Sequence, residues 1–135
     1  MEAGISLREI LWNDDIERRL APTVIDEPTY SIANLRAEVL RGTSKLVGGF
    51  RAGQLEGVMV YFVDVFGGEA EFVLQAGVGM IGDKAALQRY YPLLEQVARA
   101  HQCAAIRTHL ARDTYIPIYG RLGFRKSETV MRKAL

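Results

Sequence analysis

Apolar and polar residues in the first third of the chain follow first an extended and then a helical pattern. Residues 4–11 alternate between apolar and polar side chains, which predicts a first strand. Asn13 and Ser31 each precede a segment with helical spacing, and short polar side chains at such positions cap helix N-termini. We expect the first helix to stop by Pro22 and the second at Gly42, because glycine accepts the left-handed backbone that commonly ends a helix.

Three extended segments follow, over residues 45–51, 55–65 and 69–78. The run Val58–Val63 is apolar on both faces and rich in β-branched and aromatic residues, so it is expected in the centre of a sheet. The glycine pair at positions 67–68 predicts a tight hairpin turn between the last two segments.

The pattern becomes helical over residues 84–102, although Pro92 interrupts it. Either this helix kinks at Pro92, or its main part begins there, since proline is favoured in a first helical turn. Residues 104–110 predict a fifth strand. A short helix that opens at Asp113 or Thr114 and a last strand over residues 127–134 complete the chain.

This order of elements predicts the fold class α/β (α+β) for one domain that covers residues 1–135. We expect a mixed, mostly antiparallel sheet of six to seven strands with helices on both faces. The strand, helix and strand between residues 69 and 110 should form a right-handed crossover between parallel neighbours.

Charge is unevenly distributed, although the net charge is only +1. Residues 1–83 hold seven Lys or Arg and thirteen Asp or Glu, whereas residues 84–135 hold ten and three. A basic C-terminal half would suit a polyanionic partner such as coenzyme A or nucleic acid, and the alternative is that the two halves neutralise each other within the fold. The basic residues near the C-terminus lack interleaved aromatic residues, which argues against nucleic acid.

Features of membrane or secreted proteins are missing from the pattern. The longest apolar run is Val58–Val63, far shorter than a membrane span, and the N-terminus does not resemble a secretory signal. The single Cys103 cannot form an internal disulfide, so we expect a cytoplasmic location.

The stretch Asp113–Phe124 carries the strongest functional signal. It predicts a short helix followed by glycine, with Tyr119 four residues before Gly123 and the ending Leu122-Gly123-Phe124. Together with a strand from Ser127 to Leu135, this stretch resembles the last third of the GCN5-related N-acetyltransferase (GNAT) family. The order of elements resembles that family over essentially the whole chain.

The resemblance implies that acetyl-CoA lies where the fourth and fifth strands part. The backbone from Ala76 through Gly77 to Val78 would then pair with the pantetheine arm. The pyrophosphate would meet the start of the next helix, at Gly82, Asp83, Lys84, Ala85 and Ala86. The family signature here is Gln/Arg-x-x-Gly-x-Gly/Ala, and this sequence departs from it: Gly82 replaces the first residue, Ala85 and Leu87 replace the loop glycines, and Asp83 adds a negative charge.

The resemblance also implies catalytic roles. Tyr119 matches a tyrosine that protonates the departing thiolate, and a phenol is suited to donating one proton to a nearby sulfur. Glu71 and Glu69 share one face of the fourth strand and are candidates for the base that deprotonates an amine, with Asp64 as a third candidate. The alternatives are that Tyr119 only packs and that the carboxylates are solvated.

Two further patterns do not predict sites. His101, Cys103 and His109 do not have the spacing of metal ligands, so we predict no metal. Residues 77–82 spell G-x-G-x-x-G, but they follow a hairpin rather than an N-terminal strand, and we interpret them as the bulge and exit of the strand.

Two functions are compatible with these residues. The first is an N-acyltransferase that moves an acetyl group from acetyl-CoA to a small-molecule or peptide amine. The second is a non-catalytic GNAT-fold module for binding or assembly, similar to the degenerate acetyltransferase-like proteins among phage virion and assembly components. Such a module would act on a protein partner or as a homo-oligomer.

Overall fold

The protein is built around a mixed five-stranded sheet. The computed structural model describes residues 4–135 apart from 26, 81–82 and 111–112. The strands lie in chain order: β1 (Ile5–Glu9), β2 (Lys45–Arg51), β3 (Gln54–Phe66), β4 (Glu69–Val78) and β5 (Ala105–Thr108). Neighbours from β1 to β4 are antiparallel, and β5 is parallel to β4. The predicted mixed sheet with a parallel pair is therefore confirmed.

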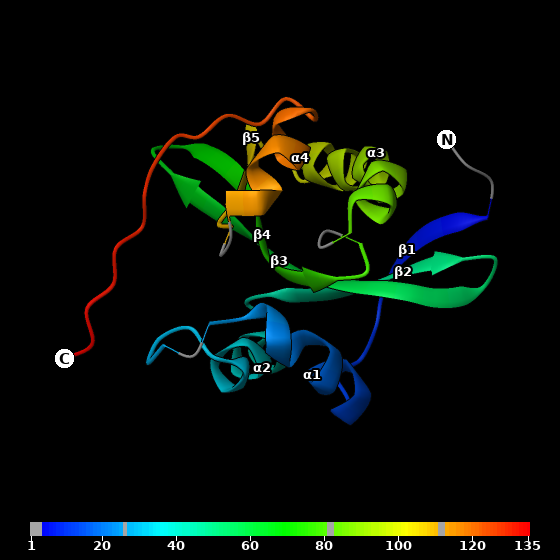
Figure 1. Ribbon diagram of the computed structural model, residues 1–135, viewed down its shortest axis with the longest axis horizontal. Helices are drawn as coiled ribbons and strands as arrows, with labels where there is room; N and C mark the ends of the chain where they lie inside the picture. The colour runs from blue at the N-terminus through cyan, green and yellow to red at the C-terminus, as the bar shows by residue number, and fades with distance from the viewer. Residues whose placement is uncertain (1–3, 26, 81–82, 111–112) are drawn as a thin grey trace.

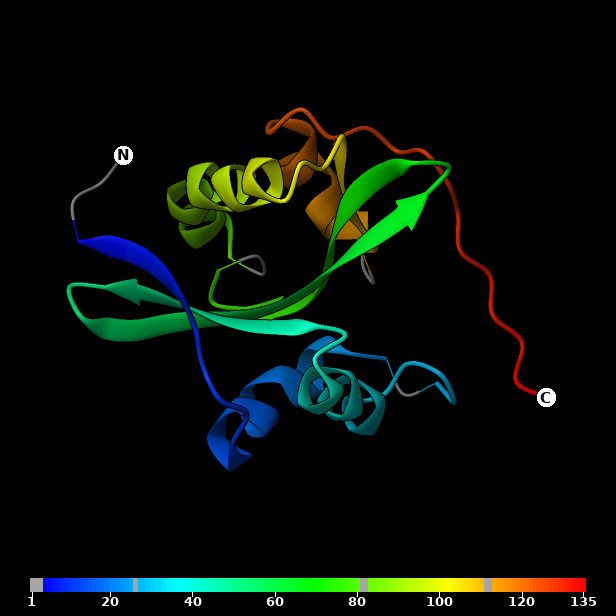
Figure 2. The same ribbon diagram turned by 180° about the vertical axis from the view of Figure 1, so that it is seen from behind.

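Helices cover both faces of the sheet (Figures 1 and 2). The first face carries α1 (Asp14–Leu20), the 3₁₀ turn η1 (Ala21–Thr23) and α2 (Ile32–Arg41). The opposite face carries α3 (Lys84–Ala100), the 3₁₀ turn η2 (Asp113–Tyr115) and α4 (Ile116–Gly120). The expected two-sided arrangement of helices is confirmed.

Strand β3 supplies both hydrophobic cores, because successive side chains of a strand point to opposite faces. Val58 and Val60 pack in the core beneath α1 and α2, whereas Met59 and Tyr61 pack in the core beneath α3. Val58, Met59 and Val60 are fully buried. This explains why the run is apolar at every position and confirms its central place in the sheet.

Local sequence signals set the helix and hairpin ends. The Asn13 side chain accepts a hydrogen bond from the Ile16 backbone N–H at 2.9 Å, and Ser31 caps α2 in the same way. Gly42 ends α2 with φ at 82°. The glycines at positions 67–68 form the two-residue turn between β3 and β4, with φ at 64° and 83°. Positive φ at both positions is the geometry that favours glycine in such turns.

Helix α3 is continuous through Pro92. The alternative in which the helix begins at Pro92 is therefore wrong, since the helix starts eight residues earlier with Asp83 as its N-cap. Tyr90 and Leu94, on either side of the proline, are fully buried against the sheet. This burial holds the helix together across a position that lacks a backbone donor.

The expected strand over residues 127–134 is wrong, and with it the expected six to seven strands. No described residue beyond Thr108 belongs to the sheet. Residues 125–135 run along the outside of the molecule as an extended chain (Figure 1). Val130 and Met131 are adjacent, so they would point to opposite faces of a strand and cannot form one buried face.

Within the described residues, no helix combines the length and the apolar character needed to cross a membrane.

Candidate functional site

Strands β4 and β5 part before β4 ends. They pair from Glu71 opposite Ala105 to Leu74 opposite Thr108, whereas β4 continues to Val78. The register between β3 and β4 shifts at this level, so that Val60 lies opposite Ala76, and Tyr61 opposite Leu74. Gln75 is the extra residue of this bulge. A bulge bends its strand, which accounts for the divergence from β5.

The bulge is held from the side of α1 and α2. Tyr30 Oη donates a hydrogen bond to the Gln75 carbonyl, and Ser44 Oγ donates to Gln75 Oε1 at 2.9 Å. Ser44 is only 2% exposed. Burial raises the pKa of Tyr30, against the opposing effect of Arg132, so this phenol keeps its proton at neutral pH. The geometry of β4 at the point of parting is therefore fixed.

A half-open cavity of about 450 Å³ fills the space between the parted strands. We call this cavity the notch. Its lining includes β4 from Leu74 to Val78, with the three predicted backbone positions Ala76, Gly77 and Val78, and the Gly79 that follows the strand. The remaining lining residues come from η1, the start of α3, the end of β5 and the short C-terminal helices: Pro22, Thr23, Asp83, Thr108, Leu110, Tyr115 and Tyr119.

Tyr119 lies in the lining of the notch and is 3% exposed. Its hydroxyl forms a hydrogen bond with the Thr108 side chain, and Thr108 Oγ1 in turn donates to the Leu74 carbonyl at 3.4 Å. The ring packs edge-on against Phe124, with centroids 5.2 Å apart. This chain of contacts places the phenol where β4 and β5 separate.

The phenol of Tyr119 is neutral under physiological conditions. Burial, with a smaller contribution from nearby Tyr115, raises its pKa to about 12, and the hydrogen bond with Thr108 opposes this rise. While Thr108 Oγ1 donates to the Leu74 carbonyl, the Tyr119 hydroxyl donates its one proton to Thr108. To donate toward negative charge that develops in the notch, this O–H has to rotate away from Thr108. The sequence-based role of Tyr119 as a proton donor stays a prediction, and it has a suitable position.

The start of α3 is already occupied by its own cap. Asp83 Oδ1 accepts a hydrogen bond from the Ala86 backbone N–H at 2.9 Å. Lys84 and Ala85 are exposed, whereas the Ala86 side chain belongs to the core. Gly82, the first residue of the expected pyrophosphate loop, lies outside the described residues. One of the donors that a phosphate would use is thus taken by a carboxylate.

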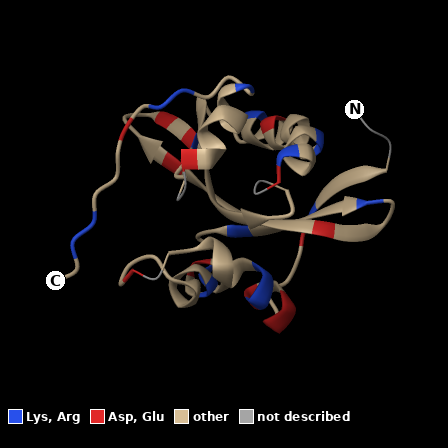
Figure 3. Ribbon diagram, in the orientation of Figure 1, with Lys and Arg blue, Asp and Glu red and all other residues tan. Residues whose placement is uncertain are grey.

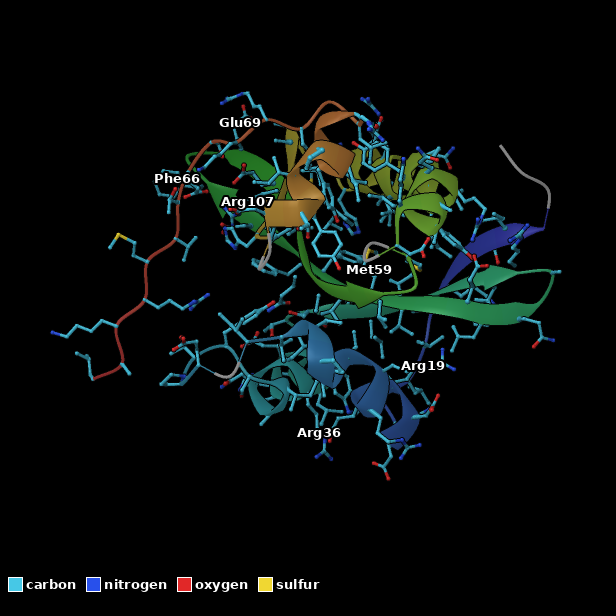
Figure 4. The ribbon with its side chains drawn as sticks, viewed as in Figure 1. Arg19, Arg36, Met59, Phe66, Glu69 and Arg107 are labelled. Carbon is cyan, nitrogen blue, oxygen red and sulfur yellow. The ribbon has the colours of Figure 1, made fainter. Side chains whose placement is uncertain are left out.

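Glu69 and Glu71 lie at the opposite end of β4 from the notch. Glu71 Oε1 accepts a hydrogen bond from Arg107 Nη1 at 2.8 Å, and Asp64 Oδ2 accepts one from Arg107 Nη2 at 3.2 Å. The structure therefore brings Asp64 and Glu71 to Arg107, and neither they nor Glu69 line the notch with Tyr119. Figure 4 shows Arg107 and Glu69 on the same side of the molecule as Phe66, near the end of the β3–β4 hairpin. Asp83 is the one carboxylate among the described residues that line the notch.

Sequence reasoning missed the central place of Arg107. An arginine in a short strand, beside acidic residues on two neighbouring strands, is the signal that indicates it. Arg107 bridges β3, β4 and β5 on one face of the sheet, so we call Asp64, Glu71 and Arg107 the charge ladder.

Two glycines fix the exit of β4. A Cβ atom on Gly57 would lie 2.6 Å from the carbonyl carbon of Gly79, and one on Gly79 would lie 2.5 Å from the Glu56 carbonyl oxygen. Gly79 also has φ at 73°. Neither position has room for a side chain, so the backbones of β3 and the β4 exit are in direct contact.

The two histidines and the cysteine do not assemble into a site in the described part of the chain. His101 Nε2 shares a hydrogen bond with Tyr61 Oη at 3.2 Å, at the end of α3. Within the described residues, no three His, Cys, Asp or Glu side chains converge on a point where a metal ion could bind.

Solved structures of acetyltransferases resemble this structure over almost the whole chain, at 10–21% sequence identity. The fold is that of GCN5-related N-acetyltransferases. No family model matches the sequence. A search of curated proteins finds no match either.

Three solved structures illustrate the similarity. An acetyltransferase from Trypanosoma brucei has a TM-score of 0.65 at 21% identity, over 97% of this chain and 99% of that chain. Glucosamine-6-phosphate N-acetyltransferase from Arabidopsis thaliana has a TM-score of 0.62 at 11% identity, over 96% and 97%. AAC(6′)-Iy, solved with the bisubstrate analogue CoA-S-monomethyl-acetylneamine, has a TM-score of 0.63 at 13% identity, over 97% of each chain.

Proposed function

We propose that the protein is an N-acyltransferase that moves an acetyl group from acetyl-CoA to an amine. The observation that carries this proposal is the notch, in which the buried phenol of Tyr119 lies where β4 and β5 part. The relatives with this fold support the same class, since one is named for acetylating glucosamine-6-phosphate and another binds a coenzyme A bisubstrate analogue.

The notch fits one part of the cofactor better than the other. Its backbone segment at Ala76, Gly77 and Val78 and its mostly apolar lining suit the acyl group and the pantetheine arm. Lys84 and Ala85 are exposed at the start of α3 and can face the phosphates, but Asp83 places a negative charge there. Bound acetyl-CoA would supply an activated thioester, which an amine can attack directly.

Tyr119 has the role of a donor in this scheme. Its raised pKa, about 12, keeps the proton on Oη throughout the neutral range. A thiol has a pKa near 8.5, so complete proton transfer from this phenol to a thiolate is unfavourable by roughly 3.5 pKa units. We therefore assign to Tyr119 a strong hydrogen bond that stabilises the departing charge, rather than full protonation.

Removal of the amine proton requires a different partner. Glu71 is ion-paired with Arg107, and neither Glu71 nor Glu69 lines the notch. We therefore assign proton removal to water in the half-open notch, with the neutral fraction of the amine as the reacting species. The role of base that the sequence predicts for Glu69 and Glu71 is left as a weaker proposal that acts through water.

The test begins with binding. Acetyl-CoA at a hundredfold excess over its dissociation constant adds about 2.7 kcal/mol to the stability of the native state, which calorimetry detects as a higher melting temperature. Thiol release, followed with a chromogenic disulfide across a panel of amines, then measures turnover. Tyr119→Phe should lower kcat about a hundredfold and leave the melting shift intact.

A non-catalytic binding or assembly module is the second candidate. The carboxylate cap at Asp83 favours it, because an anion-binding helix start does not usually carry a fixed negative charge. Absence of a melting shift at millimolar acetyl-CoA, together with absence of thiol release, would contradict the enzyme and support this module. Acetyl-CoA binding without turnover by any amine would contradict only the catalytic step.

A further inference from the structure

Thr108 lies where the paired part of the sheet meets the notch. It is the last residue of β5, and its pairing with Leu74 is the last one that the described residues make between β4 and β5. Its side chain is partly buried and belongs to the lining of the notch, together with Tyr119. A hydroxyl at this point therefore connects the strand pair to the candidate site.

The stretch of β4 beside this residue carries no charge. Residues 72–80 contain no Lys, Arg, Asp or Glu, and Figure 3 shows this part of the strand in tan. Among the described residues that line the notch, the one charged side chain is Asp83, a carboxylate that accepts hydrogen bonds. Within this lining, negative charge that develops during a reaction is therefore met by neutral donors such as the Tyr119 hydroxyl.

The Thr108 hydroxyl is engaged on two sides. Oγ1 donates to the Leu74 carbonyl at 3.4 Å and accepts the proton of Tyr119 Oη. Each hydroxyl has a single proton to donate, so both protons are used within the wall of the notch and neither is directed into it. An arrangement that donates into the notch has to be reached from this one by rotation of the hydroxyls.

Rotation of the hydroxyls is the movement that this environment allows. The Tyr119 ring is 3% exposed and packs edge-on against Phe124, with centroids 5.2 Å apart, so the ring itself is held in place. The bond from Thr108 to the Leu74 carbonyl is long at 3.4 Å, whereas ordinary O–H···O bonds are about 2.5–3.0 Å, so its loss costs little free energy. A response to charge in the notch is thus confined to two protons.

The two protons can reverse direction together. When the Tyr119 O–H turns toward the notch, its oxygen presents lone pairs to Thr108, and the Thr108 O–H can turn from Leu74 to Tyr119. A donor to the phenol oxygen polarises the phenol and makes its own O–H a stronger donor. Burial raises the pKa of Tyr119 to about 12, and the hydrogen bond with Thr108 opposes this rise in the same way. The reversed pair therefore donates more strongly than Tyr119 alone.

We propose that Thr108 is a positioning residue for Tyr119: it first accepts the phenol proton, and when negative charge develops in the notch it reverses its hydroxyl and donates to Tyr119 Oη. This inference rests on the proposed acetyl transfer, because the charge that triggers the reversal is that of the departing thiolate. Thr108 acts through Tyr119, so its contribution requires both hydroxyls. Serine at this position keeps the hydroxyl, whereas valine keeps the branching of threonine and removes it.

The first experiment tests the hydroxyl pair without any ligand. The intensity ratio of the tyrosine doublet in ultraviolet resonance Raman spectra reports whether a phenol donates or accepts a hydrogen bond, and subtracting the spectrum of the same protein with Tyr119→Phe isolates this ring. We expect Thr108→Val to change the difference spectrum and Thr108→Ser to retain it. Thr23→Val is the matched control: its hydroxyl donates to the Leu20 carbonyl at 2.7 Å in another part of the lining, so the spectrum should not change. An unchanged spectrum in Thr108→Val would overturn the proposal.

Steady-state kinetics then separates positioning from a merely structural role. Thr108→Val should lower kcat about tenfold and leave the KM for acetyl-CoA within about twofold, and Thr108→Ser should restore kcat to within about threefold. In a chain that carries Tyr119→Phe, Thr108→Val should have no further effect on kcat, because no phenol proton is left to position. Effects of the two substitutions that multiply would overturn the proposal. Absence of turnover in the unaltered protein would overturn the proposed function and this role together, and the Raman difference distinguishes that case from failure of the hydroxyl pair.

Discussion

The two ends of the β4–β5 pair differ sharply, although the same two strands form both. At the hairpin end, the charge ladder of Asp64, Glu71 and Arg107 ties three strands together. At the other end, β4 bulges at Gln75 and leaves β5, and Tyr119 lies in the gap. The comparison teaches that a local opening between two strands has two structural requirements. Side-chain ion pairs hold the strands together at one end, and a bulge bends one strand away from the other at the opposite end.

The largest expected effect comes from filling the backbone contact at the open end. Gly57→Val should lower the free energy of unfolding by about 3 kcal/mol, because a side chain there meets backbone atoms of Val78 and Gly79. Urea denaturation measures the loss. Gly120→Ala is the control: a Cβ at that position meets nothing within 4 Å, so stability should change by less than about 1 kcal/mol. Equal effects of the two substitutions would refute the close contact.

The closed end should respond to loss of its arginine. Arg107→Met leaves Asp64 and Glu71 directly opposite each other across β3 and β4, so we expect a loss of about 1–2 kcal/mol in unfolding free energy. The melting shift with acetyl-CoA should be retained, because the ladder is outside the notch.

Two further comparisons test whether Arg107 stabilises the fold through its charge. Arg99→Met removes an arginine whose side chain is 78% exposed and should cost at most about 0.5 kcal/mol. In a chain that carries Asp64→Asn and Glu71→Gln, Arg107→Met should cost less than in the unaltered protein. An unchanged cost would show that the arginine acts by packing and not by charge.

A smaller effect is expected at the start of α3. Asp83→Asn keeps an N-cap that can bind the Ala86 N–H and removes the negative charge, so acetyl-CoA should bind about fivefold more tightly. Isothermal calorimetry gives the dissociation constant. Asp14→Asn, in the first turn of α1, is the matched control and should leave it unchanged. If Asp83→Asn has no effect either, the phosphates do not approach this helix.

The smallest effect is spectroscopic and requires no ligand. Burial raises the pKa of Tyr90, Tyr91 and Tyr119 to about 12, above the ordinary value of 10. Because the folded pKa values are raised, their contribution to stability is complete below pH 10 and is lost as the pH rises toward 12. Absorbance at 295 nm should therefore show late-titrating tyrosines in the folded protein and ordinary titration in urea. Tyr119→Phe should remove one late group, and an unchanged late amplitude would contradict its burial.

Local sequence signals predicted much of the fold. The caps Asn13 and Ser31, the end at Gly42 and the doubly apolar run in β3 all depend on nearby residues, so they could be read directly. The last strand was predicted from the order of elements and the family resemblance, and it is wrong: residues 125–135 form no strand, and Val130 and Met131 are exposed. The length and composition of a segment such as residues 127–134 do not indicate whether a neighbouring strand is available to pair with it.

The site was less accessible to sequence reasoning. Tyr119 and the segment Ala76–Val78 were placed by resemblance, and the structure brings them to one cavity. Glu69 and Glu71 were chosen because they share a face of a strand, but the distance along that strand from the notch depends on where the pairing with β5 stops. The register between strands that are distant in sequence determines where the β4–β5 pairing ends. The same register brings Arg107 next to Asp64 and Glu71, so this cluster could not be predicted from local sequence.

The contact between Gly57 and the β4 exit has a mechanical consequence. This contact holds β4 in place, because the end of the strand packs against the β3 backbone and Tyr30 donates a hydrogen bond to the Gln75 carbonyl. On the opposing side of the notch, β5 pairs with β4 only from Glu71 to Leu74 within the described residues, so it is not paired with the part of β4 beyond Leu74 that lines the notch. We therefore expect any widening of the notch for a bulky ligand to come from movement of β5 and α4, in the C-terminal third of the chain.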